Sequence, residues 1–388
     1  MEVPKSISLF CELLEQNGYR AFLVGGCVRD MLMHEPPHDY DITTNARPEE
    51  LLAVFRKSGL RAVKIGGVCG TVSVSDGQQS AEITPFRRES GYTDFRRPDD
   101  VTFVDDVDED LSRRDFTMNA MALSKAGDLT DRFGGKEDIA NKMLRCVGNP
   151  YDRFREDPLR ILRAMRFLAR FSFHAEAHTK TAMISLSHLL KLLSAERIFS
   201  ELKLLLETPA PLSVIAEFID VLKVILPGFI PYERLDFLPN NSLLRLFCLL
   251  YRCPSDLYRN TVLSLKPSTS EKEFLFGLYS LQNESINPLA FLFFTVPARH
   301  ALRRYGEEMV ERYLDFLELD KTAFTRYRSN GVWKLSQLAV SGSDFLLLGM
   351  EGAKIGTALS LLLCAVIEEK VQNEKETLVS FLKGNNLC

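Results

Sequence analysis

The hydrophobic pattern of the chain changes near residue 150, and this change limits the folds that the sequence can adopt. Before it, apolar runs typical of strands alternate with helical patterns, at residues 20–24, 39–43, 61–65, 71–75, 80–84 and 101–104. After Pro150 the apolar residues recur with a period of about 3.6 almost everywhere, as in LRILRAMRFLARF and IFSELKLLLE. The sequence therefore predicts an α+β fold, with a small mixed-sheet domain followed by an all-helical region.

Bulk properties narrow the class of protein. At 388 residues the chain is too long for one compact core and predicts about two to four domains. Its net charge is −4, so a contact with a polyanion must come from local basic clusters. The eight cysteines include no C-x-x-C pair, which argues against structural zinc and favours a reducing cytoplasm. The N-terminus reads poorly as a signal peptide, and no apolar run reaches membrane-spanning length.

Residues 23–44, LVGGCVRDMLMHEPPHDYDITT, carry most of the information about function. Gly25 and Gly26 would let the backbone approach a phosphate closely, and the helix expected after them begins with unpaired N–H groups. Asp39 and Asp41 are two residues apart, so on a strand both carboxylates would point to one face. Such a pair suits a hard, oxygen-preferring cation such as Mg²⁺. A triphosphate cradle beside a metal site predicts nucleotidyl transfer.

Each half of this segment also has a simpler interpretation. A Gly-Gly pair is usually an ordinary turn, and a D-x-D motif is usually a polar strand end or loop. D-x-D also occurs in metal-dependent glycosyltransferases. The ordered combination of strand, glycine pair, short helix, loop and D-x-D strand is much harder to reach by chance, and it favours the functional interpretation.

A third acidic candidate is Glu82, in the apolar–acid–apolar triplet of a predicted strand. Such an acid faces away from its apolar neighbours, so it either completes the carboxylate set or faces solvent. Residues 82–100 then look like a mobile loop, although an ordinary solvated loop is the better explanation unless a domain movement needs it. Four arginines lie in this segment: Arg87, Arg88, Arg96 and Arg97.

Residues 113–120, RRDFTMNA, are predicted to begin a helix. A guanidinium here would clamp phosphate or ribose, because its planar fork matches the geometry of an oxyanion. Asp115 would hold that arginine in place or accept a hydrogen bond from a ribose hydroxyl. The simpler alternative is a weakly stabilising surface ion pair at a helix start.

An arginine stripe is the second strong signal. Pro158 suits a first helical turn, so a helix is expected to begin near Asp157. Arg160, Arg163 and Arg166 then follow at steps of three and form a slanted basic stripe on a helix whose remaining surface is largely apolar. Because such a helix is packed, the stripe favours an oriented anion or base partner over a solvated basic face.

The spacing of Asp157 and Arg160 makes them neighbours on a helix surface. The carboxylate accepts hydrogen bonds and the guanidinium donates them. Cytosine and adenine each offer an amine donor beside a ring-nitrogen acceptor, whereas uracil and guanine present a carbonyl in place of the amine. The pair would therefore accept C and A and reject U and G, since a mismatch leaves buried polar groups unpaired. Such a protein would choose its nucleotide without a nucleic-acid template.

These residues resemble the motifs of the class II tRNA nucleotidyltransferase and bacterial poly(A) polymerase family, most closely its CCA-adding enzymes. LVGGCVRD with DYDITT is similar to the first motif, and RRDFTMNAMAL to the second. DRFGG at 131–135 resembles the family's hinge, EDPLR at 156–160 its amino-acid template, and AERIFSEL at 195–202 the motif that braces the template. The segment 338–356 is similar to the tail-domain turn, with Ala353 where the family often has Pro.

The resemblance implies a polymerase-β-like head followed by a helical neck, body and tail. The corresponding ranges are 1–146, 147–208, 209–300 and 301–388, the last binding tRNA. It implies that Asp39 and Asp41 bind two Mg²⁺ ions, and that residues 85–100 form the loop associated with the switch from CTP to ATP. It assigns phosphate, ribose or base contacts, or support of the template, to Gly26, Arg29, Arg114, Asp115, Asp157, Arg160, Arg163 and Arg166.

The expected reaction is addition of C, C and A to the 3′ end of tRNA from CTP and ATP, with release of pyrophosphate. An enzyme that adds only A, or only CC, shares these motifs, although the full-looking loop weighs against CC alone. A poly(A) polymerase is disfavoured because the long basic C-terminal extension of that branch is not seen. A non-catalytic RNA-binding protein is disfavoured by the intact Asp39 and Asp41. The sequence points to no membrane contact and allows no protein partner to be inferred.

Overall fold

The computed structural model describes residues 3–65, 67–95 and 98–384, so Gly66 and the loop arginines Arg96 and Arg97 lie outside the described residues. The chain divides into two compact units, Met1–Pro227 and Gly228–Cys388. The finer boundaries expected near residues 146, 208 and 300 remain predictions.

A seven-stranded sheet forms the centre of the first unit, in the order β3-β4-β5-β2-β1-β8-β9. Its strands are β1 (Ala21–Val24), β2 (Asp41–Thr44), β3 (Arg61–Lys64), β4 (Val72–Ser75), β5 (Ser80–Pro85), β8 (Ala122–Ser124) and β9 (Leu129–Thr130). The pair β2–β5 is parallel, and the other neighbouring strands are antiparallel. The predicted α+β fold is confirmed, as is the tight hairpin between β4 and β5.

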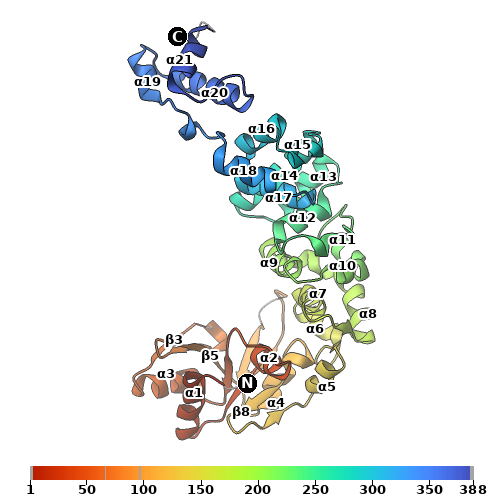
Figure 1. Ribbon diagram of the computed structural model, residues 1–388. Helices are drawn as coiled ribbons and strands as arrows, with labels where there is room; N and C mark the ends of the chain where they lie inside the picture. Colours follow the sequence, from red (N-terminus) through yellow and green to blue (C-terminus); the bar gives the residue numbers. More distant parts are fainter. Residues whose placement is uncertain (1–2, 66, 96–97, 385–388) are drawn as a thin grey trace. The chain divides into compact units, whose positions relative to one another are not determined.

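Helices α1 (Lys5–Gln16) and α3 (Pro48–Lys57) pack on one face of this sheet (Figure 1). On α1 the buried side chains recur at helical spacing, and Phe10 meets Phe55 of α3 edge to face, with ring centroids 6.0 Å apart. Full burial of a side chain of this size stabilises a fold by about 1.5–3 kcal/mol. Because strand residues alternate between faces, the polar residues next to this core point to the opposite face of the sheet.

Strand β2 begins at Asp41, not at residue 39 as the pattern predicted. The cause lies in the neighbouring strand β1, whose last paired residue, Val24, lies opposite Asp41. At Gly25 the chain turns away with φ 74° and ψ −133°, and α2 (Gly26–Leu32) follows. Asp39 therefore precedes the strand and is brought near Asp41 by the connecting segment, not by strand alternation.

Two other segments also differ from the expectation. Residues 113–120 do not begin a helix, because α4 (Val107–Ser112) ends directly before them and only a 3₁₀ turn, Thr117–Asn119, follows. Part of the predicted mobile loop is an antiparallel hairpin of β6 (Arg87–Ser90) and β7 (Asp100–Phe103), which leaves only residues 91–99 as its connection. The hydrophobic pattern could not show β6, because its sequence, RRES, contains no apolar residue.

The helical part of the first unit begins with α5 (Gly135–Ala140) and α6 (Pro150–Glu156) and continues through α7 (Leu159–Phe171). Asp157 lies in the break between α6 and α7, with φ −144° and ψ 98°, so the expected helix start near Asp157 is wrong by two residues. The cause is Pro158, since a proline disfavours the helical conformation of the residue before it.

Helix α7 packs against α9 (Ala195–Leu206), and α8 (Ala177–Ser185), α10 (Leu212–Glu217) and α11 (Ile219–Lys223) complete this part of the unit. The apolar residues of α7 are buried, as its sequence predicted. The helical prediction is incomplete at one point, because β11 (His174–Ala175) pairs in parallel with β10 (Met143–Leu144).

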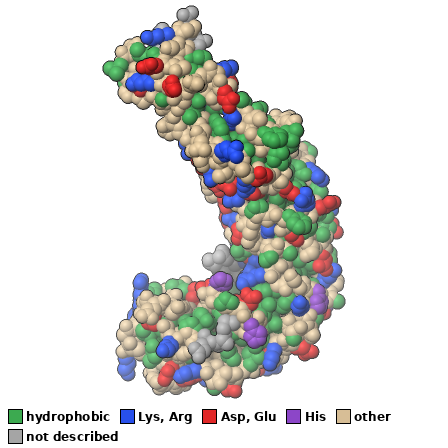
Figure 2. Space-filling model, viewed as in Figure 1, with side chains coloured by type: hydrophobic (Ala, Val, Ile, Leu, Met, Phe, Trp, Pro, Cys, Tyr) green, Lys and Arg blue, Asp and Glu red, His purple; other side chains and the backbone are tan. Residues whose placement is uncertain are grey.

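The described residues of the second unit are helical, as predicted. Its helices are α12 (Ser242–Leu250), α13 (Ser255–Ser264), α14 (Thr269–Asn283), α15 (Pro288–Leu292), α16 (Val296–Tyr305), α17 (Glu307–Phe316), α18 (Thr322–Asn330), α19 (Gly342–Leu347), α20 (Ala353–Ile367) and α21 (Lys375–Gly384). No helix in the described ranges is long and apolar enough to cross a bilayer. On the face drawn in Figure 2, acidic and basic side chains are interspersed, in line with the small net charge.

Candidate active site

Two carboxylates lie where strands β2 and β5 run side by side, and Asp39 is near enough to Asp41 to act on its charge. Asp41 and Glu82 are direct partners in the parallel register of these strands. Both alternate with residues of the apolar core, Ile42 on β2 and Ala81 and Ile83 on β5, so both point away from α1 and α3. Asp39 and Glu82 are exposed, and Asp41 keeps access to solvent.

The surroundings raise the pKa of the Asp41 carboxyl. Loss of hydration is the main cause, and the nearby carboxylates of Glu82 and Asp39 add to it, while Arg114 acts in the opposite direction. Among the described residues, no three histidine, cysteine, aspartate or glutamate side chains converge closely enough to hold a metal ion by themselves. The site is thus a small group of carboxylates that repel one another, with one arginine beside them.

Gly25 brings the backbone close to the guanidinium of Arg114 and the carboxylate of Asp41. A Cβ atom built on Gly25 would lie 3.0 Å from Nη1 of Arg114 and 3.7 Å from Oδ2 of Asp41. Its positive φ also places it where side-chain-bearing residues rarely lie. Gly26 is different, because a Cβ there would meet Arg29 Nη2 at 3.5 Å, an ordinary contact. Of the two glycines, Gly25 is the one that this geometry requires.

Arg114 is anchored from behind by Asp110, whose side chain is fully buried. Asp110 Oδ2 accepts a hydrogen bond from Arg114 Nη2 at 3.1 Å, and Oδ1 accepts two from Arg113 at 2.7 and 2.9 Å. Burial alone would raise the pKa of Asp110, but Arg113 and Arg114 lower it. Arg114 Nε is buried and has no partner among the described residues, so this guanidinium is not saturated by the protein.

Arg29 is 5% exposed and is engaged entirely inside the protein. Its Nε and Nη2 donate to Asp30 Oδ1 at 2.8 and 2.6 Å, and its Nη1 donates to Asn119 Oδ1 at 2.7 Å. Asn119 Nδ2 in turn donates to Asp115 Oδ1 at 3.1 Å. These contacts tie Arg29 to Asp115 through Asn119.

Asp115 lies where the head meets α7. Arg163 donates from Nε and Nη2 to Asp115 Oδ2, at 3.1 and 2.7 Å. Burial would raise the pKa of Asp115, but Arg163, Asn119 and Arg160 hold it at about 2. Asp115 therefore stays ionised and joins the segment after α4 to the arginine stripe.

Asp157 and Arg160 do not pair with each other. Asp157 Oδ2 accepts a hydrogen bond from Arg197 Nη2 of α9 at 2.7 Å, and Oδ1 accepts one from the Leu159 amide at 3.1 Å. Arg160 Nη1 donates to Glu156 Oε2 at 2.7 Å. The expectation that the two residues neighbour each other on a helix surface fails for Asp157, yet each side chain is held in place by another partner.

Helix α9 braces α7 at two points. One is the Arg197–Asp157 pair, and the other is an ion pair between Glu201 and Nε of Arg166. Arg197 Nη1 also donates to the carbonyl of Phe95 at 3.3 Å, so the tip of the β6–β7 hairpin lies against the same brace. The sequence motif at 195–202 thus has the contacts expected of a support for the preceding helix.

The sequence indicated Gly25 only as one of two glycines at a turn, and it indicated neither Asp110 nor Arg197 as a site residue. The Gly-Gly pair contained a signal for Gly25, since one of two adjacent glycines at a turn often has a positive φ. Arg197 lies inside a motif that had been recognised. Nothing in the local pattern singled out Asp110, because an aspartate in an acidic first helical turn looks solvated.

The mixed sheet that carries Asp41 and Glu82, together with its helical extension, defines a nucleotidyltransferase of the polymerase-β-like class. Residues 21–145 match the family described as the poly A polymerase head domain, and residues 172–232 match one described as the probable RNA and SrmB-binding site of polymerase A. The chain belongs to the tRNA nucleotidyltransferase and poly(A) polymerase family, in which its relatives are CCA-adding enzymes.

Both full-length relatives and a solved structure carry this assignment. The chain is 34% identical to the CCA-adding enzyme of Lactobacillus helveticus, over 96% of this chain and 95% of that one. It is 32% identical to the enzyme of Bacillus cereus over the whole of both chains. The crystal structure of the Bacillus stearothermophilus CCA-adding enzyme in complex with CTP aligns with a TM-score of 0.81 at 29% identity, covering 100% of this chain and 98% of that one.

Proposed function

We propose that this protein adds C, C and A to the 3′ end of tRNA, using CTP and ATP and no nucleic-acid template. Two groups of residues support the proposal. Asp41 and Glu82 are neighbours on two strands, with Arg114 beside Asp41. Asp157 and Arg160 are each held in place by another side chain. The first group suits the chemistry of nucleotidyl transfer, and the second suits the choice of a base.

The carboxylates of Asp39, Asp41 and Glu82 suit Mg²⁺. Asp41 with Asp39, and Glu82 beside them, would hold the ion, because oxygen donors whose charges repel one another are relieved by a hard cation. The absence of a closed set of three ligands among the described residues agrees with this ion, which usually takes one or two carboxylates and completes its shell with water and substrate phosphate. When bound, it would supply charge neutralisation for the triphosphate and activation of the attacking hydroxyl.

The remaining residues of the head would orient the nucleotide. Arg114 would donate to a triphosphate oxygen from Nη1, which lies beside Gly25 and makes no hydrogen bond in the described part of the chain, and Asp110 fixes its direction. Asp115 would accept from a ribose hydroxyl. Gly26 would contribute backbone only. Arg29 would act through Asn119, because its guanidinium is already engaged by Asp30 and Asn119.

Asp157 and Arg160 would read the base with the hydrogen-bonding groups that their contacts within the protein do not use. A carboxylate has about four lone-pair sites and a guanidinium has five N–H groups. Asp157 accepts two bonds, and Arg160 donates to the Arg153 carbonyl and Glu156 from Nη1 and to the Arg113 carbonyl from Nη2. Each therefore keeps atoms for a cytosine or adenine edge, and Arg163 and Arg166 would support the helix through Asp115 and Glu201.

The cellular site that fits this reaction is the cytoplasm. The described cysteines are all free thiols, and burial raises the pKa of several, including Cys11 and Cys146 to about 12, so these thiols stay protonated.

The test uses three tRNA transcripts, ending before the CCA sequence, after its first C and after its second C. Each is incubated with the protein, Mg²⁺, CTP and ATP, and the products are resolved by length. Extension of the first transcript to a full CCA end is expected. Labelling of the third transcript alone would make this an A-adding enzyme, and no labelling would favour a binding protein. Asp39→Ala should abolish transfer while leaving tRNA affinity largely intact.

A further inference from the structure

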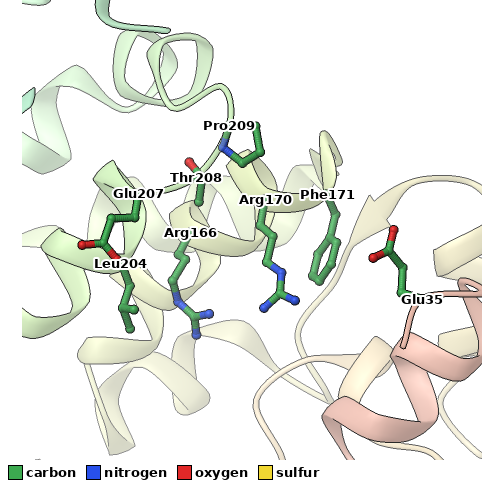
Figure 3. Close-up of a pocket in the computed structure, with 8 residues that line it drawn as sticks. All are labelled: Glu35, Arg166, Arg170, Phe171, Leu204, Glu207, Thr208 and Pro209. Atoms are coloured by element: carbon green, nitrogen blue, oxygen red, sulfur yellow. The ribbon is translucent and has the colours of Figure 1, made fainter. Parts of the chain in front are cut away.

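A pocket of about 420 Å³ lies beside the C-terminal half of α7, and the reaction proposed above does not use it. Figure 3 shows the residues that line it. Arg166, Arg170 and Phe171 come from α7, and Glu35 comes from the segment between α2 and β2. The remaining wall is the end of α9 and the turn after it, within residues 204–209.

Arg170 distinguishes this pocket from an ordinary surface hollow. Its side chain is exposed, and within the described ranges it has no hydrogen bond or ion pair. The other arginines of the stripe, Arg160, Arg163 and Arg166, each donate to a carboxylate. The guanidinium of Arg170 lies 5.1 Å from the ring centroid of Phe171, and Figure 3 shows it extending from α7 in the same direction as that of Arg166. A guanidinium without a counter-ion beside an aromatic ring suits a phosphate next to a stacked base.

The Phe171 ring is held rigidly. It stacks on Phe167 with an interplanar angle of 12° and a centroid separation of 6.0 Å. The buried guanidinium of Arg29 lies 4.8 Å from the Phe171 centroid. Arg29, Arg170 and Phe167 already lie on this ring, so a base would pack against the part of Phe171 that stays exposed, which is fixed in place and loses little entropy.

The position of the pocket separates it from the base-reading residues. Arg170 follows Arg160 by ten residues on one helix, which corresponds to about 15 Å along the axis. The opposite wall, at Glu35, lies four residues before Asp39 in the chain. The pocket thus lies between the helix that would read the base and the segment that leads to Asp39 and Asp41. The arginines of α7 continue from the base-reading residues to the pocket.

We propose that this pocket binds one nucleotide of the single-stranded end of the RNA that receives the new nucleotide, an inference that rests on the proposed function. The phosphate lies at Arg170, with Arg166 beside it, and the base packs on Phe171. Glu35, which with Glu207 is one of two carboxylates that line the pocket, would repel a phosphate, so it faces the sugar and accepts a hydrogen bond from the ribose 2′-hydroxyl. That hydroxyl is the group that distinguishes RNA from DNA.

The first test replaces Arg170 and measures binding of a tRNA transcript that lacks CCA. Arg170→Gln should weaken binding about tenfold, the loss of one charge-assisted contact, and should lower the slope of log affinity against log salt by about one. Arg170→Lys should keep the slope. The KM for CTP should not change, because the incoming nucleotide lies elsewhere. Arg61→Gln is the matched control, since Arg61 is an exposed arginine on the edge strand β3 and lines no part of this pocket.

The second test uses transcripts with a single deoxyribose at each unpaired 3′ nucleotide in turn. One of them should bind the wild-type protein more weakly, and Glu35→Ala should abolish that difference. Unchanged tRNA affinity and salt slope in Arg170→Gln, or a rise in the KM for CTP instead, would overturn the proposal, as would equal binding of all deoxy transcripts. The affinities, the salt slopes and the deoxyribose effects are binding measurements, so failure of the wild-type protein to extend tRNA would refute the proposed function separately.

Discussion

Replacing Gly25 by alanine should damage the site in a way that replacing its neighbour does not. Gly25 has φ 74° and ψ −133°, and holding alanine in such a conformation costs about 1–3 kcal/mol. For a unit of this size that corresponds to a fall in melting temperature of about 2–12 °C. The new Cβ would also lie 3.0 Å from Arg114 Nη1, so the guanidinium must move by a few tenths of an ångström. Displacement of a positioning group on this scale should lower kcat/KM for CTP by about ten- to a hundredfold.

Gly26→Ala is the control, because its Cβ makes only an ordinary 3.5 Å contact with Arg29 and its φ is not positive. Its kcat/KM should stay within about threefold of the wild type, since alanine is the better helix former by up to about 1 kcal/mol. Both variants are measured by single-nucleotide addition to tRNA and by thermal unfolding. If Arg114 transmits the effect, Gly25→Ala should cost little more activity in an Arg114→Ala background. Equal losses in the two glycine variants, or full activity of Gly25→Ala, would refute the reasoning.

Four further perturbations test the electrostatics of the site. Asp41→Asn should abolish transfer, yet it should raise the melting temperature at pH 7 when Mg²⁺ and nucleotide are absent. Because folding raises the pKa of Asp41, the ionised carboxylate lowers the stability of the fold at neutral pH. The gain in melting temperature should vanish as the pH falls below the ordinary pKa of a carboxyl group. Asp115→Asn should lower the free energy of unfolding by about 2 kcal/mol at pH 7, because the pKa of Asp115 in the folded protein, about 2, lies below the ordinary value. Urea titrations should show that this deficit shrinks between about pH 4 and pH 2. A deficit that does not depend on pH would contradict the prediction. Asp157→Ala or Arg160→Ala should admit GTP and UTP in a nucleotide-competition assay, with a milder effect for Arg197→Ala, which only positions Asp157; continued exclusion of both nucleotides would defeat the base-reading argument. Asp110→Asn should raise the KM for CTP and cost about 3 kcal/mol in chemical denaturation, because Arg114 loses its buried counter-charge while Arg113 keeps Glu89. An unchanged KM would show that Arg114 needs no such anchor.

The sequence predicted the fold class and the main strands because local chemistry determines them. Alternation of apolar and polar residues marks β4 and β5, and the Asp76–Gly77 pair marks the turn between them. β6 escaped prediction because its backbone pairing with β7 is independent of side-chain pattern. The helix break at Asp157 was predictable in principle from Pro158, because a proline suits the start of a helix and disfavours the helical conformation of the residue before it.

The sequence allowed us to predict which kinds of residue belong to the candidate site, but not which of them pair with one another. Arg160 and Asp157 are close in sequence, yet Asp157 takes its partner, Arg197, from a helix forty residues further along the chain. Asp115 and Arg163 are likewise joined only by the packing of α7 against the head. Sequence spacing indicates which side chains share one helix face, and it carries no information about which groups the tertiary fold brings to that face.

The buried partners explain how so many charges can sit in one small region. An arginine held by a buried carboxylate has a fixed direction, so its free N–H groups can point at a substrate without a further loss of side-chain entropy. Asp110 does this for Arg114, and Glu201 does it for Arg166. Asp41 and Glu82 are instead direct neighbours on two strands, and the charge of Glu82 raises the pKa of Asp41 while Arg114 lowers it. The charges proposed to orient the nucleotide are therefore balanced within the protein, whereas the carboxylates proposed to perform the transfer would be balanced by a bound cation.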